Sequence, residues 1–151
     1  MSQSLTKIYI HLVFSTKYRR DSLPKDHLAD VHAYMAAIFN NNGCLAIQVG
    51  GTTNHVHALF VLGKQVNLAD IVRRVKSCTS RWINETYGNL FFHFGWQDGY
   101  GAFSVGYRHV DTVVAYIKGQ EEHHRKKTFQ NELRQICESY DVKLDERYAW
   151  D

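Results

Sequence analysis

The segment LAIQVGGTTNHVHALFVL, residues 45–62, consists of two apolar runs separated by a short polar sequence. Leu45–Val49 and His55–Leu62 are rich in β-branched and aliphatic residues, and each has the length of an ordinary strand. Gly50–Asn54 (GGTTN) has the composition of a turn. These residues therefore predict a β-hairpin, and the segments on either side can be placed relative to it.

The segments before and after this hairpin alternate between strand and helix patterns. Ile8–Phe14 (IYIHLVF) predicts a central strand, and Tyr100–Val105 (YGAFSV) is a candidate edge or closing strand. A helix from about Leu68 to Tyr87 is expected between the hairpin and that last strand, because its apolar residues lie near one face: Ile71, Val72, Val75, Cys78, Trp82 and Ile83. The helix predicted after Pro24 carries apolar residues at helical spacing: Leu28, Val31, Met35 and Ile38.

Two further helices are expected after the last strand. Asp111 is a candidate N-cap for a helix that runs to about Lys126, and a final helix covers roughly Phe129–Tyr140. The complete order is β-α-β-β-α-β with helices appended. This order predicts an α+β fold of the ferredoxin-like (RRM-like) type, with an antiparallel sheet, helices on one face and appended C-terminal helices.

Composition limits the class of protein. The chain has 151 residues, 44% of them hydrophobic, a single proline and no Gly/Ser-rich linker, so residues 1–151 are expected to form one domain. No apolar run approaches the roughly 20 residues that span a bilayer, and the N-terminus lacks a signal-peptide pattern. We therefore expect no membrane partner. The scattered cysteines, Cys44, Cys78 and Cys137, fit a reducing cytoplasm better than a disulfide framework.

Basic residues are clustered, although the net charge of +3 is by itself weak support for a polyanionic partner. A solvated surface is the ordinary explanation for any one cluster taken alone. The clusters are Lys17, Arg19 and Arg20 around Tyr18; Arg73, Arg74, Lys76 and Arg81; and Arg125, Lys126 and Lys127.

A histidine pair begins the second strand of the predicted hairpin. His55 and His57 are separated by Val56, and alternate side chains of a strand share a face. Both imidazoles are therefore expected on one side of the sheet, where they can share a metal ion. Two histidines on a half-buried strand without a ligand are the alternative, because H-x-H arises easily by chance in a chain with nine histidines.

A second polar pair lies in the helix predicted after Asp111. Tyr116 and Gln120 are four residues apart, so their side chains are stacked neighbours in a helix. Gln120 offers a carbonyl oxygen as a metal ligand. Tyr116 offers a phenolic oxygen, which becomes a nucleophile when a nearby cation or base favours the phenolate. Considered alone, the helix is better explained by a tyrosine at a helix–sheet boundary and a solvated glutamine.

The residues after Tyr116 leave further alternatives open. Gly119 costs a helix interior roughly 1 kcal/mol relative to alanine, so it predicts close packing, a bend or a weak helix end. His124 could approach the same site, because it continues the row of Tyr116 and Gln120. His123 and His124 could also form a separate metal site, or end the helix as polar residues favoured by its dipole.

Together these residues resemble a known family. A strand with histidine, a hydrophobic residue and histidine, followed by a helix with Y-x-x-x-Q, is the pattern of the single-tyrosine HUH transposases, the insertion-sequence-200/605 group. Three other segments are similar to that group: His11–Arg19 (HLVFSTKYR), Asn54–His57 (NHVH) and Trp96–Tyr100 (WQDGY). The resemblance covers nearly the whole chain, but it is weaker after about Lys127, and we assign no chemistry to residues 128–151.

The resemblance implies metal-dependent cleavage and rejoining of single-stranded DNA. It places the metal ligands at His55, His57 and Gln120, and the nucleophile, which forms a 5′-phosphotyrosine, at Tyr116. The implied cofactor is Mg²⁺ or Mn²⁺. The implied partners are DNA hairpins near the element ends and a second copy of the chain. In such a homodimer the tyrosine helix of one subunit often completes the site of the other.

With a DNA substrate, the basic clusters have an expected role as phosphate contacts. The candidates are Lys17, Arg19, Arg20, Arg73, Arg74 and Lys76. Tyr18 and four later aromatic residues could stack on unpaired bases. Core packing is the stronger expectation for those four, which are Phe91, Phe92, Phe94 and Trp96.

Three other functions remain open at the level of sequence. A non-catalytic RNA- or DNA-binding module could use the same fold, but the inner strands show no RNP-like aromatic signature. A metal-dependent hydrolase could use His55 and His57 with water as the nucleophile, and it would stay active without the Tyr116 hydroxyl. A host-domesticated relative could act on dispersed genomic repeats rather than mobilise its own element.

Overall fold

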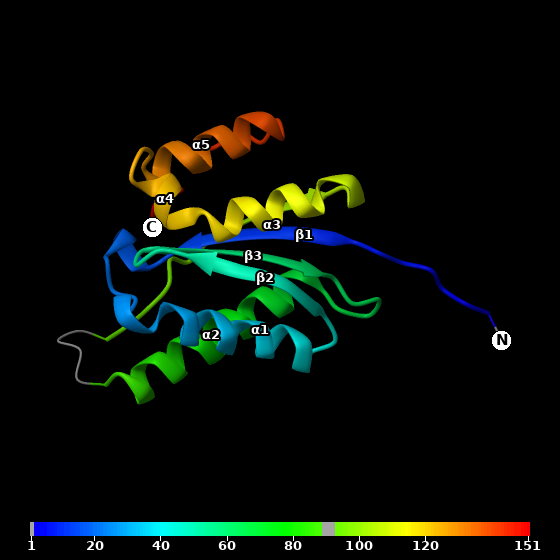
Figure 1. The fold of residues 1–151 in the computed structure, drawn as a ribbon, viewed down its shortest axis with the longest axis horizontal. Coiled ribbons are helices and arrows are strands. Elements are labelled where there is room, and N and C mark those ends of the chain that lie inside the picture. Colours follow the sequence, from blue (N-terminus) through cyan, green and yellow to red (C-terminus); the bar gives the residue numbers. More distant parts are fainter. Residues whose placement is uncertain (1, 89–92) are drawn as a thin grey trace.

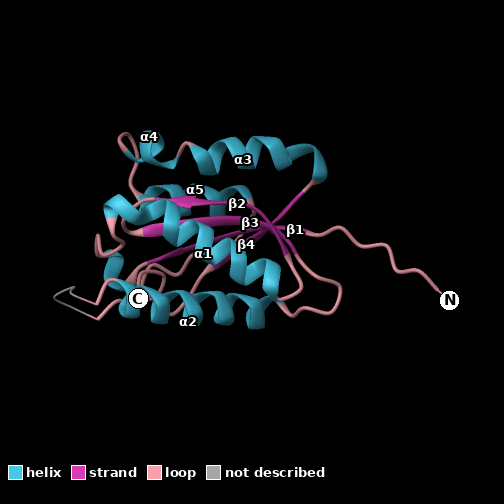
Figure 2. Cartoon of the chain, turned by 60° about the horizontal axis from the view of Figure 1, so that its bottom comes forward, coloured by secondary structure: helices cyan, strands magenta, loops and turns pink. Residues whose placement is uncertain are grey.

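The computed structural model describes residues 2–88 and 93–151. Within these ranges, four strands form one antiparallel sheet with the order β2-β3-β1-β4 (Figure 2). The inner strands β1 and β3 are buried along almost their whole length. The strands are β1 (Tyr9–Ser15), β2 (Leu45–Gly51), β3 (His55–Val61) and β4 (Gly101–Val105).

Two helices, α1 (Leu28–Asn41) and α2 (Leu68–Thr86), cover one face of this sheet (Figure 1). The predicted apolar spacing places their buried side chains toward the sheet, where they form the main core. α2 begins where the Asn67 side chain accepts a hydrogen bond from the Asp70 backbone N–H. Fully buried members of this core include Leu12, Phe14, Val31, Met35, Phe39, Phe60 and Val75.

Three C-terminal helices cover the opposite face of the sheet (Figures 1 and 2). They are α3 (Val110–Lys118), α4 (Gln120–His124) and α5 (Phe129–Ser139). Ile117 of α3 packs on Leu59, and Phe129 of α5 packs with Phe103 and Val13. The β-α-β-β-α-β order with appended helices is therefore confirmed, and the sheet lies between two helical layers.

The helix predicted from Asp111 to about Lys126 is wrong in two details. Its N-cap is His109 rather than Asp111, which lies in the first turn, where the helix dipole favours a carboxylate. The helix is also interrupted at Gly119, whose φ of −89° and ψ of 14° separate α3 from α4. Of the three explanations for Gly119, the structure supports a bend at a helix end. A Cβ atom there would lie 3.4 Å from the Ala115 carbonyl oxygen, an acceptable contact.

The hairpin turn is shorter than predicted, because Gly50 and Gly51 belong to β2 and only Thr52–Asn54 remains outside the strands. Gly50 pairs with His57 in the sheet register. A Cβ atom at Gly50 would lie 2.8 Å from both the carbonyl oxygen and Cγ2 of Ile117. The missing side chain therefore allows α3 to pack directly beside His57.

The aromatic segment before β4 contributes to the core. Phe94 and Trp96 are 1% and 7% exposed, so core packing, the stronger expectation for these residues, is confirmed. Phe91 and Phe92 lie outside the described residues. None of the helices in the described ranges is both long enough and apolar enough to cross a membrane.

Candidate metal centre and tyrosine site

β3 presents its two histidines on the face covered by the C-terminal helices. His55 and His57 are both 0% exposed, and their ring centroids lie 5.3 Å apart. Val56 lies between them and packs into the core on the other face. The shared orientation of the two imidazoles follows from the alternation of a strand.

His55 is held between the hairpin turn and the start of α4. Its Nδ1 atom lies 2.8 Å from Asn54 Oδ1 and 3.0 Å from Thr52 Oγ1. Its Nε2 atom lies 2.8 Å from Gln120 Oε1. The ring is therefore fixed at one nitrogen, and the other nitrogen faces the predicted third ligand.

Gln120 is the first residue of α4 and is 1% exposed. Its amide nitrogen donates to the Tyr116 carbonyl oxygen at 3.4 Å and to Glu132 Oε2 at 3.3 Å. Because the nitrogen has these acceptors, the amide oxygen is directed toward His55. Tyr116 and Gln120 thus reach one site, as the spacing of four residues predicts.

His57 contacts two residues that the sequence analysis did not identify. Its Nδ1 atom lies 2.8 Å from His11 Nε2, and its Nε2 atom lies 2.8 Å from Glu132 Oε1. His11 lies on β1, on the same face as Tyr9 and Val13. An imidazole within such an apolar strand is the signal that could have identified it.

Tyr116 lies over the histidine pair of its own chain. Its ring is nearly perpendicular to that of His57, with the centroids 5.5 Å apart, and its hydroxyl donates to Glu132 Oε2. Burial raises the pKa of Tyr116 above its ordinary value, and the Glu132 carboxylate raises it further. Although burial opposes it, hydrogen bonds from His124 and His57 hold the pKa of Glu132 below its usual range.

The atoms around His55 fit a metal ion. Burial lowers the pKa of His55 to about 3, so the ring is neutral and carries a single N–H. Its two nitrogens nevertheless each face an oxygen acceptor, Asn54 Oδ1 and Gln120 Oε1. A cation on Nε2 would resolve this conflict, because Nδ1–H could donate to Asn54 while Nε2 and the Gln120 oxygen both coordinate.

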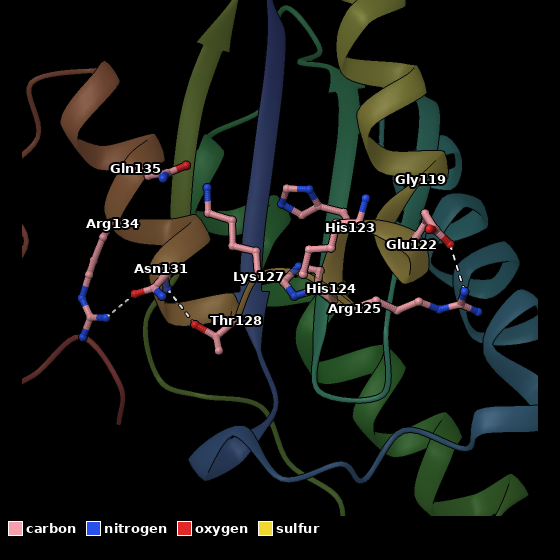
Figure 3. A pocket seen from close by; sticks show the side chains of 11 residues that line it. Gly119, Glu122, His123, His124, Arg125, Lys127, Thr128, Asn131, Arg134 and Gln135 are labelled. Carbon is pink, nitrogen blue, oxygen red and sulfur yellow. Dashed lines mark hydrogen bonds and ion pairs between the residues drawn. The ribbon is translucent and has the colours of Figure 1, made fainter.

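The histidines at the end of α4 also reach this site. His124 Nε2 bonds Glu132 Oε2 at 3.1 Å, whereas His123 Nε2 lies 3.2 Å from the same oxygen without forming a hydrogen bond. Both line an open pocket of about 1060 Å³ between α4 and the start of α5, as Figure 3 shows. Basic side chains from Arg125–Lys127 border the same pocket.

The first group of predicted DNA contacts lies near the His55 end of the sheet. Lys17, Arg19 and Arg20 follow β1, whose last residue, Ser15, pairs with His55. The Lys17 ammonium and the Arg20 guanidinium lie 5.1 and 5.2 Å from the ring centroid of Tyr18, which is 59% exposed. Tyr18 and Arg20 are exposed and Lys17 and Arg19 are half-buried, so the group forms a basic and aromatic surface in which Lys17 also pairs with Asp98 at 3.6 Å.

The second group lies on α2 and is less uniform. Arg73 and Arg74 are exposed, and Arg73 forms an ion pair with Asp70 at 3.4 Å. The Lys76 ammonium donates to the carbonyl oxygens of residues 97–99, and burial lowers its pKa to about 8. Lys76 therefore supports the segment before β4, and its donors are largely engaged.

The fold and these contacts define a class of protein: a ferredoxin-like domain in which an inner strand presents a buried histidine pair to a tyrosine-bearing helix. Residues 4–120 match the family described as "Transposase IS200 like". The match covers most of the chain, and the protein belongs to the IS200-like transposase family. Membership of this family supports an enzymatic role in DNA recombination.

Two solved structures share the fold. One is a candidate transposase of Deinococcus radiodurans R1, with a TM-score of 0.63 and 21% identity over 80% of this chain and 98% of that chain. The other is a REP-associated tyrosine transposase bound to a REP hairpin, with a TM-score of 0.56 and 14% identity over 82% of this chain and 74% of that chain. None of the curated proteins matches the chain.

Proposed function

We propose that this protein is a transposase that cleaves and rejoins single-stranded DNA through a covalent link between Tyr116 and a 5′-phosphate. The observation that carries the proposal is the convergence of the Tyr116 side chain, the Gln120 amide oxygen and the Nε2 atoms of His55 and His57 in one buried site. One chain supplies all four groups, which supports a site completed within a single subunit.

The Tyr116 side chain accounts for both strand cleavage and strand rejoining. The phenolic oxygen of Tyr116 attacks the phosphorus, and the bond from phosphorus to the 3′ oxygen breaks. The 3′ oxygen leaves with a proton as a 3′-OH, and the 5′-phosphate stays on the tyrosine. Because the phosphodiester is conserved in this link, another 3′-OH can reverse the step on a new strand and restore the phenol without ATP.

We assign His55, His57 and Gln120 as ligands of a divalent ion, Mg²⁺ or Mn²⁺. When bound, the ion polarises a phosphoryl oxygen and orients the phosphate for in-line attack. Two imidazoles alone would also suit zinc, whereas an oxygen ligand favours the harder cations. Contacts to Nδ1 of both histidines keep their Nε2 atoms directed at the site.

We infer that the DNA partner is a single strand with hairpins near the element ends. The similar REP-associated tyrosine transposase is described as bound to a REP hairpin. In this chain, the surface formed by residues 17–20 offers cations for phosphates and an exposed aromatic ring for an unpaired base. Arg73 and Arg74 offer a second basic surface, to which Lys76 adds little because its donors are engaged.

We also propose that residues 1–151 act as one domain and that two copies associate as a homodimer. Strand exchange requires two DNA ends to be held together, and a second copy would bring the second site. The edge strands β2 and β4 each have one unpaired side in the described sheet, which is a surface for such association. The molar mass in light scattering tests this assembly.

The metal assignment is tested with a labelled hairpin-bearing single strand and Mn²⁺. His57→Ala should abolish cleavage, because it removes a ligand atom from the site. His93→Ala is the control, since it removes an exposed histidine on another part of the molecule. Cleavage by the His57 variant at the wild-type rate would show that the metal site is assigned wrongly.

A further inference from the structure

Glu132 is the most buried carboxylate among the described residues, and it lies outside the segment that matches the family, which ends at residue 120. It belongs to α5 and is 1% exposed. Its two oxygens contact side chains from β3, α3 and α4, namely His57, Tyr116, Gln120, His123 and His124. The proposed function gives this residue no role.

We propose that Glu132 is a fourth protein ligand of the metal ion, so that α5 is attached to the metal centre. The inference rests on the proposed function, because it assumes an ion on His55, His57 and Gln120. The inference adds to that metal site a ligand from α5.

The distances fit coordination by Glu132 Oε1. This oxygen lies 2.8 Å from His57 Nε2 and 3.8 Å from His55 Nε2. Gln120 Oε1 lies 2.8 Å from the same His55 nitrogen. Ligand atoms about 2.1 Å from an octahedral ion are separated by about 3 Å when adjacent and about 4 Å when opposite. These three separations therefore lie close to those of atoms that share one ion.

The charge of the site also calls for a cation. A carboxylate this deeply buried is destabilising unless a positive charge or a metal compensates it. Within the described residues, the ion-pair partners of Glu132 inside 4.0 Å are four imidazoles, and no lysine or arginine is among them. A divalent ion beside Oε1 would supply that charge, and a carboxylate oxygen is a ligand type that Mg²⁺ and Mn²⁺ prefer.

The position of Glu132 on α5 places it on the buried face of the helix. Phe129, Leu133 and Cys137 form the buried face of this helix and pack on Val13 and Phe103 of the sheet. Glu132 lies three residues after Phe129 and is 1% exposed, so it is on the same face. Thr128 caps the helix by accepting a hydrogen bond from the Asn131 N–H at 3.2 Å, which fixes where the face begins.

The test measures Mn²⁺ binding without DNA, by isothermal calorimetry and by the electron paramagnetic resonance signal of free Mn²⁺. Glu132→Gln keeps the shape of the side chain and removes its charge. Glu138→Gln removes an exposed charge from the same helix and is the matched control. We expect the Kd for Mn²⁺ to rise by at least about tenfold for Glu132→Gln, because losing even a residue that only hydrogen-bonds a metal ligand weakens metal binding by about tenfold or more. It should be unchanged for Glu138→Gln.

Amide hydrogen exchange gives a second readout. Mn²⁺ should slow exchange within residues 129–139 of the wild type and of Glu138→Gln, and it should not do so in Glu132→Gln. Equal affinity in the wild type and Glu132→Gln, with exchange in α5 unaffected by Mn²⁺, would overturn the inference and leave the three-ligand site intact. A wild type that binds no Mn²⁺ would instead overturn both the inference and the proposed metal site.

Discussion

At the scale of single residues, half of the candidate site follows from local periodicity. The alternation of a strand places His55 and His57 on one face, and the spacing of four residues predicts that Tyr116 and Gln120 are neighbours, as they remain across the break at Gly119. Glu132 could not be assigned in this way, because it meets His57 across 75 positions of sequence. Only the docking of α5 on the sheet brings the two together, and no local pattern predicts that docking.

His32 provides a prediction at the same scale. Burial lowers its pKa to about 4, and its Nε2 atom has no hydrogen-bond partner in the described structure. The folded state therefore binds a proton less readily than the unfolded state, whose histidine titrates near 6.5. Titration of His32 therefore leaves the free energy of unfolding unchanged above pH 6.5 and lowers it as the pH falls from 6.5 toward 4.

Replacing His32 with glutamine removes this titration. Between pH 7.5 and 5, the free energy of unfolding of the wild type should fall relative to His32→Gln by on the order of 1–2 kcal/mol. Urea unfolding in the presence of a chelator measures the difference, and His93→Gln controls for the loss of an exposed imidazole. Parallel pH dependences for the wild type and His32→Gln would contradict the predicted role of burial.

At the scale of elements, the strands and the long helices could be predicted from the sequence, whereas the points where one element ends and the next begins could not. Apolar runs bounded by polar residues identified β1 and the hairpin, and the 3.6-residue period identified α1 and α2. The interruption at Gly119 could not be distinguished from a continuous helix, because a glycine lowers helix propensity without fixing a bend. The two glycines after Val49 suggested a turn, yet they complete β2, because they pair with His57 and Val56 of β3.

Gly50→Ala should move α3 away from β2. The new Cβ atom would meet Ile117 at 2.8 Å and push α3 away from His57. Overpacking of this kind costs roughly 1–3 kcal/mol of stability. Because Tyr116 and Gln120 move with the helix, DNA cleavage should fall by about tenfold or more, since small displacements of reacting groups are costly.

Gly99→Ala is the matched control for this substitution, because a Cβ atom at Gly99 has no neighbour within 4 Å. Thermal unfolding and the cleavage rate are measured for both variants. A Gly50→Ala protein that cleaves DNA as fast as Gly99→Ala would show that the close approach of α3 and β2 does not position the tyrosine.

At the scale of the whole molecule, the sheet separates two layers with different roles. α1 and α2 pack on one face to form the main apolar core with the strands, and α3, α4 and α5 enclose the candidate site on the other face (Figure 1). The C-terminal tail returns to the sheet, where the Ala149 carbonyl oxygen accepts a hydrogen bond from Gln97 Nε2 at 3.2 Å. Within residues 128–151, the segment that the sequence left without chemistry, α5 closes one side of the site through Glu132.

The most direct test of the proposed function is the identity of the atom that becomes attached to DNA. The protein is incubated with a labelled hairpin-bearing single strand and Mn²⁺, denatured, and digested for peptide mapping. We predict a denaturant-resistant protein–DNA species linked through Tyr116, which is absent from Tyr116→Phe although that variant still binds the DNA. A covalent link on another residue, or cleavage by Tyr116→Phe at the wild-type rate, would contradict the proposed mechanism.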